Sequence, residues 1–319
     1  MLLRQQGVAL ITALLVVAIA TVAAVAMATR QQMDIRRTGG LLHSEQAYAF
    51  SLGAESWAQV VLARDKRNSK IDTLYEDWST QPPVSVVEGG SIIGRILDLQ
   101  GRFNVNNLVV NGAADNDAIA FYKRLLRRLD LDEALADPLV DWIDSNIDVL
   151  FPDGAEDEAY LGAETPYRTA NRLLVDISEL RLVKGYEPDI IEQLRPFVAA
   201  LPEVTALNVN TASAEVLSTV AENMSLADGE SLLETRGEDG FETVDKFTGQ
   251  KELGQKQQLT TAQLSVESNW FLMVSEANIG QSRARLASLI QRTDKGMLVV
   301  RRQREFLEPV VAPVAEQDE

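Results

Sequence analysis

The sequence predicts an α+β fold, in which a long N-terminal helix packs on an antiparallel sheet and a large all-α domain is inserted into that sheet. Three observations predict it. An uncharged apolar run near the N-terminus continues into a helical spacing of apolar residues. Alternating apolar and polar residues, typical of half-buried strands, occur in two groups far apart in the chain. Between these groups lies a long acidic stretch with helical patterns.

Composition limits the classes of function. The chain has 319 residues, of which 46% are hydrophobic, so it can bury a substantial core. Its net charge of −17 disfavours nucleic acid or an anionic membrane surface as a general partner, because both would repel it. The absence of cysteine excludes a disulfide framework, and the single histidine, His43, disfavours a nucleophilic triad. We therefore do not expect an enzyme.

The N-terminal apolar run is predicted to be a membrane anchor. Residues Val8–Thr29 carry no charge, and as a helix they would span roughly 33 Å, enough to cross a hydrocarbon core of about 30 Å. A short polar leader, residues 1–7, precedes the anchor and ends in Gly7. Charge does not settle the orientation, since one arginine precedes the anchor and three follow it closely.

This leader resembles that of type IV pilins and type II secretion pseudopilins. The resemblance implies that a prepilin peptidase cuts after Gly7 and methylates the new N-terminus, Val8. Most members carry glutamate at the fifth mature position, where a carboxylate neutralises the N-terminal amine of a neighbouring subunit in apolar surroundings. This chain has Thr12 there, which implies a place at the tip of a fibre. The same pattern resembles the general secretion pathway protein K family, the minor pseudopilins of the type II secretion system.

The anchor is predicted to continue as one long amphipathic helix to about Arg67, with a bend near Gly39, because glycine weakens a helix by about 1 kcal/mol relative to alanine. Two strand-like runs joined at a Gly-Gly turn then predict a hairpin. Further strands are predicted near the C-terminus. The predicted strands are Val84–Glu88, Ser91–Leu99, Trp270–Ile279, Arg283–Arg292 and Met297–Phe306.

A long helix packed on an antiparallel sheet is the pilin-like fold, which the family resemblance also implies. The segment Leu97–Leu108 leaves the predicted sheet and resembles a stretch that leads into an inserted helical region in protein K members. The expected organisation is a leader (1–7), a transmembrane helix (8–29), the first part of a pilin-like domain (30–110), an inserted α-helical domain (111–266), the last strands (267–308) and a flexible tail (309–319).

The insertion contains a strongly acidic segment. From Leu129 to Tyr167 there are twelve acidic residues and no lysine or arginine. Apolar residues are interleaved with the acids, so folding would draw the carboxylates together, and like charges at close range must protonate or acquire a cation. A solvated acidic face is the alternative interpretation of such a run.

Oxygen ligands without histidine or cysteine favour a hard ion, and clustered carboxylates suit Ca²⁺ better than Mg²⁺. We expect one or two structural Ca²⁺ ions in an acidic loop over residues 141–160, which also resembles the calcium-binding loop of protein K pseudopilins. The spacing is not that of an EF-hand. The candidate ligands are Asp144, Asp148, Asp153, Glu156, Asp157 and Glu158, with Asp141 as a further candidate.

The remainder of the insertion is predicted to be helical, over Leu173–Lys184, Asp189–Ala200, Ser225–Arg236 and Thr243–Gly249. Residues 205–250 resemble helix-hairpin-helix modules, some of which bind DNA. Here the hairpin, Ala221–Ser225, has an acidic residue and no glycine, so it lacks the backbone donors that would hold a phosphate. We expect this part to serve packing or protein contacts and not to bind nucleic acid.

The resemblance implies a role as a minor pseudopilin that starts or caps the pseudopilus. Its implied partners are minor pseudopilins I and J, and H, together with the major pseudopilin, the prepilin peptidase, the secretin and secreted substrates. The implied location is the bacterial inner membrane, crossed once, with the C-terminal domain in the periplasm. Two alternatives stay open, a calcium-binding periplasmic adaptor held by an unprocessed anchor and a calcium-dependent hydrolase.

Overall fold

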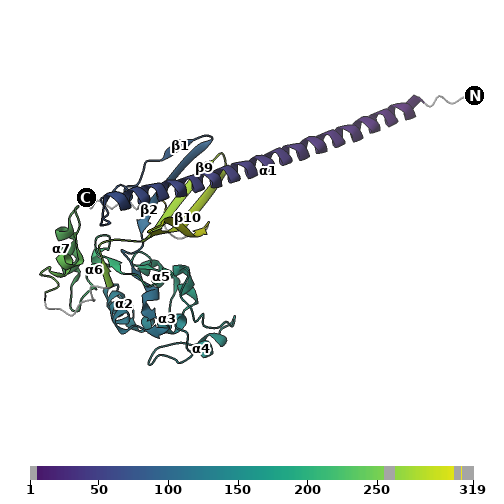
Figure 1. The fold of residues 1–319 in the computed structure, drawn as a ribbon. Coiled ribbons are helices and arrows are strands. Elements are labelled where there is room, and N and C mark those ends of the chain that lie inside the picture. Colours follow the sequence, from purple (N-terminus) through teal and green to yellow (C-terminus); the bar gives the residue numbers. More distant parts are fainter. Residues whose placement is uncertain (1–5, 255–262, 305–309, 311–319) are drawn as a thin grey trace, which may run out of the picture.

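The fold begins with one continuous helix, α1 (Gln6–Asn68), which projects far beyond the rest of the molecule (Figure 1). The computed structural model describes residues 6–254, 263–304 and 310. The predicted long helix is confirmed, but the predicted bend near Gly39 is absent, since α1 runs straight through it (Figure 1). Within the described residues, α1 is the one helix long and apolar enough to cross a membrane. Most of the predicted leader and tail lies outside the described residues.

The C-terminal part of α1 lies on a five-stranded antiparallel sheet with the order β1-β2-β9-β10-β11. The predicted hairpin forms, because Val87 pairs with Gly90 around a two-residue turn at Glu88 and Gly89, where Gly89 takes a positive φ of 82°. The predicted C-terminal strands form as well. The strands are β1 (Ser85–Val87), β2 (Gly90–Asp98), β9 (Trp270–Ile279), β10 (Ser282–Thr293) and β11 (Gly296–Gln303).

The two faces of this sheet bury different partners, as the period of two in a strand dictates. Alternate residues such as Ile96, Phe271 and Leu286 pack against Ala58 and Leu62 of α1. The intervening residues pack on the opposite face, where the inserted domain lies (Figure 1); this second cluster comprises Leu97, Leu99, Ala199, Leu201, Trp270, Leu272, Val274, Ala287 and Leu289. The sheet is therefore a layer between α1 and the insertion.

The insertion connects β2 to β9 and is mainly helical. Its α-helices are α2 (Asn116–Arg128), α3 (Ala136–Ile143), α4 (Asp157–Leu161), α5 (Pro188–Leu194), α6 (Ala214–Leu217), α7 (Leu226–Arg236) and α8 (Val244–Thr248). Its 3₁₀ helices are η1 (Val105–Leu108), η2 (Glu133–Leu135) and η3 (Ile177–Leu182). Side chains of Ser213, Ser225 and Thr243 cap α6, α7 and α8.

The insertion is not wholly α-helical, because three two-stranded ladders occur within it. They are β3 with β6 (Phe103–Asn104 and Val198–Ala199), β4 with β5 (Val109–Val110 and Ala113–Ala114), and β7 with β8 (Leu207–Asn208 and Leu264–Ser265). Phe103, Val105 and Leu108 already belong to the main core of the insertion. By packing, the insertion therefore begins where the chain leaves β2, earlier than the expected residue 111.

Candidate functional site: the acidic loop and the N-terminal anchor

The anchor residues singled out by the sequence lie in the exposed part of α1. Gly7 and Val8 are both helical, so the expected cleavage point lies within the first turns of α1. The Thr12 hydroxyl donates to the carbonyl oxygens of Val8 (3.1 Å) and Ala9 (3.0 Å). Its polar group is thus satisfied inside its own helix, and Thr12 presents no charge to a neighbouring helix.

The acidic loop starts at the end of α3, which places Asp141 and Asp144 one turn apart at its C-terminal end. Asp141 is fully buried, and its carboxylate accepts hydrogen bonds from the backbone N–H groups of Leu150 (3.1 Å) and Ala155 (2.7 Å). These bonds draw residues on both sides of Gly154 onto the end of α3. Asp141 therefore organises the loop.

Two further carboxylates are buried beside Asp141. The Asp144 carboxylate accepts from the backbone N–H of Asn146 (3.1 Å). Glu156 is also buried, and neither of its carboxylate oxygens has a hydrogen-bond partner in the described part of the chain. An unpaired buried carboxylate is costly unless it binds a proton or a cation.

The buried carboxylates also affect one another's ionisation. Burial raises the pKa of Glu156, the nearby Thr169 hydroxyl opposes this, and repulsion from Asp141, Asp144 and Asp157 raises it further. Burial and the charge of Asp148 raise the pKa of Asp144, although the backbone bond from Asn146 opposes this. Burial also raises the pKa of Asp141, against the bonds from Leu150 and Ala155. The loop therefore attracts positive charge.

The other candidate ligands are placed differently. Asp157 is engaged with Arg168 (2.7 Å) and with the backbone N–H of Thr169 (3.0 Å). Asp148, Asp153 and Glu158 are exposed at the edge of the loop. Within the described residues, the acids whose oxygens come within 4.8 Å of one another in a group of three are Asp65, Asp72 and Glu76, far from this loop in the sequence. Of the predicted ligands, Asp141, Asp144 and Glu156 are the ones the structure buries, but their oxygens do not form a group of three within 4.8 Å of one another.

Comparison with known proteins identifies the family. The family models for type II secretion system protein K match residues 101–203 and 207–267. The chain is 39% identical to type II secretion system protein K of Pseudomonas aeruginosa over 93% of this chain and 91% of that protein. It is 32% identical to the Aeromonas hydrophila protein of the same name, over 94% of this chain and 96% of that protein.

The chain belongs to the type II secretion system protein K family. A solved structure agrees with this assignment. It is a chain in the crystal structure of the GspK-GspI-GspJ complex from the enterotoxigenic Escherichia coli type 2 secretion system, with a TM-score of 0.77 and 30% identity over 85% of this chain and 100% of that chain. The predicted family and the pilin-like fold with a helical insertion are therefore confirmed, and the chain has the role of a minor pseudopilin.

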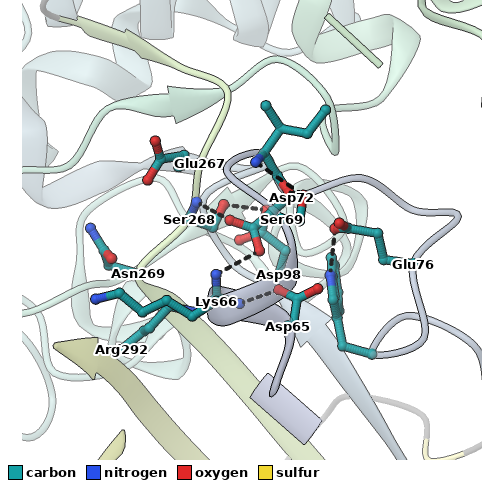
Figure 2. A network of polar contacts seen from close by, with 12 residues as sticks. Asp65, Lys66, Ser69, Asp72, Glu76, Asp98, Glu267, Ser268, Asn269 and Arg292 are labelled. Carbon is teal, nitrogen blue, oxygen red and sulfur yellow. Dashed lines mark hydrogen bonds and ion pairs between the residues drawn. The ribbon is translucent and has the colours of Figure 1, made fainter. Parts of the chain in front are cut away.

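This protein K chain also contains a buried polar network that sequence reasoning missed. Asp65 lies in the last turn of α1, Asp72 follows the helix, and Asp98 ends β2; Figure 2 shows them together with Ser268 and Arg292. Arg292 of β10 forms ion pairs with Asp65 (2.9 Å) and Asp72 (2.8 Å). Its guanidinium carbon lies 4.6 Å from the centre of the Phe271 ring. One cation thus serves two aspartates.

The third aspartate connects this network to the insertion. Asp98 accepts hydrogen bonds from the Ser268 hydroxyl (2.6 Å), the Asn208 side chain (3.2 Å) and the Thr211 hydroxyl. Burial raises the pKa of Asp98, against these bonds, and raises the pKa of Asp72 to about 8 despite Arg292. The network therefore joins α1, the sheet and the insertion at one buried point.

Proposed function

We propose that this chain is the minor pseudopilin at the tip of the pseudopilus, where it starts or caps assembly together with minor pseudopilins I, J and H. The observation that carries the proposal is the similarity to a protein K chain solved in a complex named for K, I and J, which this chain matches over that chain's whole length. Growth of the pseudopilus below this subunit would push folded substrates toward the outer-membrane secretin. The mechanism is mechanical, and no reaction is required.

Thr12 supports the tip position. In an apolar fibre core, a subunit with a carboxylate can pair with the N-terminal amine of a neighbouring subunit, and a subunit without one cannot. Because the Thr12 hydroxyl bonds to its own helix, it offers no substitute for that charge. The insertion covers the sheet face opposite α1 and adds bulk that would hinder a further subunit.

Co-purification with the partners tests this function. The full chain, with α1 intact and in neutral detergent, should form a stable complex with the I and J subunits of the same organism at micromolar concentration. Size-exclusion chromatography with light scattering would give the stoichiometry. A mixture in which each protein elutes alone would count against the tip complex.

Processing at the leader separates this function from the adaptor alternative. In cells with an active prepilin peptidase, mass spectrometry should find protein that begins at methylated Val8. A Gly7→Ala variant should keep residues 1–7 and should fail to restore secretion in a strain that lacks protein K. An adaptor held by an unprocessed anchor would be indifferent to this substitution. The leader would lie in the cytoplasm and the C-terminal domain in the periplasm.

We also propose that the acidic loop binds one or two Ca²⁺ ions. The proposal that Ca²⁺ fits this loop rests on Glu156, whose two buried carboxylate oxygens lack hydrogen-bond partners in the described residues. It also rests on the neighbouring acids, which offer only oxygen ligands. Glu156 and Asp144 would hold the ion, with Asp148, Asp153, Asp157 and Glu158 as further ligands and Asp141 as the residue that shapes the loop. The ion would supply the positive charge that the loop lacks. If the chain had the same melting temperature in calcium and in excess chelator, the proposed calcium binding would be refuted.

A further inference from the structure

A cleft of about 580 Å³ lies between the β11 edge of the sheet and the η3 and α5 helices of the insertion. Strand β11 contributes Arg301 and Gln303 to its lining, and the insertion contributes Arg181 and Arg195. Leu272 and Ala287, from the sheet face opposite α1, also line it. We call this the junction cleft. Its size is that of sites that bind small ligands or short peptide segments, roughly 300 to 1,000 Å³.

The junction cleft is basic in an acidic protein. Four arginines line it, against two acids, although the whole chain carries a net charge of −17. The four are Arg102, Arg181, Arg195 and Arg301, and the acids are Asp176 and Glu192. No lysine is among the lining residues. Arginine presents a planar fork of donors that matches a carboxylate better than the point charge of lysine does.

The acids in the cleft hold two of these arginines in place. Asp176 pairs with Arg301 across the cleft (3.0 Å), and Glu192 pairs with Arg195 within α5 and its C-terminal end (2.7 Å). Burial alone would raise the pKa of Asp176, but hydrogen bonds from Ser178, the charge of Arg301 and a bond from Gln303 hold it below its usual value. Asp176 is therefore ionised at neutral pH and fixes the β11 wall.

Arg181 lies at the open side of the cleft. It is exposed, and its Nε donates to the carbonyl oxygen of Ser178 within η3 (2.8 Å). Arg195 is only partly buried, with 26% of its side chain exposed. The exposed Arg181 and the partly exposed Arg195, which Glu192 holds, therefore lie beside the apolar residues Leu272 and Ala287, so the cleft combines guanidinium donors with an apolar lining.

We propose that the junction cleft binds an acidic peptide segment of a partner protein, with Arg181 and Arg195 pairing with its carboxylates and apolar side chains seated on Leu272 and Ala287. Charge complementarity carries the choice of occupant, because the cleft is locally positive while the rest of the chain would repel an acidic segment. An extended peptide fits both features, since alternate side chains can face the arginines and the floor.

The test measures binding of a fluorescein-labelled peptide of alternating glutamate and leucine to the full chain in neutral detergent, by fluorescence anisotropy. The same peptide with lysine in place of glutamate is the charge control. A double variant, Arg181→Gln with Arg195→Gln, should bind the acidic peptide about tenfold more weakly. Arg283→Gln, an exposed arginine on β10 outside the cleft, should bind it as the unmodified chain does. Rising salt should weaken the binding.

The melting temperature of each variant shows whether it folds. If the double variant is unstable, Arg181→Gln alone serves, because Arg181 is exposed and bonds only within η3 among the contacts described above. Equal binding of the lysine peptide, no binding of the acidic peptide, or equal binding by a folded cleft variant would overturn the proposal. A chain that binds the peptide only after Glu316, Asp318 and Glu319 are neutralised would also overturn it, because its own tail would then be the occupant.

Discussion

At the scale of single residues, the burial of Glu156 is the observation that favours the proposed calcium loop over a solvated acidic face. A solvated acid would be exposed, whereas Glu156 is only 5% exposed and lacks hydrogen-bond partners in the described residues. The surrounding cations partly neutralise other acids of the segment. Lys123 pairs with Asp137 (2.6 Å) and Arg168 with Asp157 (2.7 Å). Among the acids of this segment with no ion pair in the described residues, Glu156, Asp144 and Asp141 are buried.

The first prediction concerns the charge of Glu156. Replacing Glu156 with Gln should weaken Ca²⁺ binding by about tenfold or more, because it removes a formal charge from a buried ligand. Without calcium, the variant should be at least as stable as the unmodified chain, because the buried negative charge of Glu156 no longer repels the neighbouring carboxylates. Isothermal titration and thermal unfolding in chelator measure the two effects. Glu164→Gln, an exposed acid of the same segment, is the control and should change neither value.

The second prediction is a pH dependence with a defined sign. The pKa values of Asp141, Asp144 and Glu156 are raised in the folded protein, so without calcium the loop destabilises the fold as pH rises through these raised values. Calcium binds the ionised form and removes that penalty. The increase in melting temperature on adding calcium should therefore be larger at pH 7.5 than at pH 5. A calcium effect that is constant over this range would exclude these carboxylates as the ligands.

At the scale of elements, the loop depends on one glycine. A Cβ atom at Gly154 would lie 2.2 Å from the Asp141 carboxylate and 2.4 Å from the Leu150 carbonyl oxygen. Both neighbours belong to the turn that Asp141 organises, so neither can move without breaking its hydrogen bonds. Gly162, eight residues later at the end of α4, has open space at the same position.

The third prediction compares these two glycines. Gly154→Ala should destabilise the chain by about 1 to 3 kcal/mol, as for an overpacked buried site, and should weaken Ca²⁺ binding because the loop can no longer close on Asp141. Gly162→Ala should be neutral, since nothing obstructs the added methyl group. Urea unfolding with and without calcium measures both variants. If the two variants had the same free energy of unfolding and the same calcium response, the close packing at Gly154 would be unimportant.

Regular elements could be predicted from local pattern, and short ones could not. The strands over 270–279 and 283–292 alternate clearly, and the structure has them within a residue. The helix predicted over 189–200 ends instead at Leu194, because Pro196 has no backbone N–H with which to continue the helical hydrogen bonds, and β6 follows. The helix predicted over 173–184 shrinks to η3, since Asp176 is extended and caps it.

The burial of acids that are close in the sequence could be predicted, whereas their role as calcium ligands stays a prediction. The acids of residues 141–160 form one dense run interleaved with apolar residues, and Asp141, Asp144 and Glu156 of that run are buried. Asp65, Asp72, Asp98 and Arg292 lie in four separate segments, and each is unremarkable in its own surroundings. Only the tertiary arrangement of α1, β2 and β10 brings them together. No sequence pattern of fixed spacing could have revealed that network.

At the scale of the whole molecule, the three-aspartate network holds the insertion on the pilin-like frame. Asn208 of the insertion donates to Asp98 (3.2 Å), to Ser268 (2.8 Å) and to the carbonyl oxygen of Asp72 (3.1 Å). In the proposed tip role, force on this subunit would have to pass between the anchor helix and the bulky insertion. A buried, directional junction transmits such force better than apolar contacts alone, because hydrogen bonds and ion pairs fix its geometry.

The final prediction tests how much that junction depends on its one arginine. Arg292→Leu removes the cation that pairs with Asp65 and Asp72, and breaking a buried pair in this way costs about 3 to 5 kcal/mol. The loss should be larger at pH 8 than at pH 5. Because burial raises the pKa of Asp72 to about 8, this carboxyl is protonated at pH 5, where it needs no partner, and the cost of ionising it lowers the stability of the fold as pH rises toward that value.

The matched control is Arg127→Gln, which removes an ion pair with Glu133 of the same kind but on the surface, where the arginine side chain is 66% exposed. It should cost about 0 to 1 kcal/mol with little dependence on pH. If both variants lose the same stability, the buried network contributes no more than a surface pair, and the insertion must be held by its apolar contacts with the sheet. If only Arg292→Leu is destabilising, and its effect is larger at pH 8 than at pH 5, then Arg292 is the cation that stabilises the junction of α1, the sheet and the insertion.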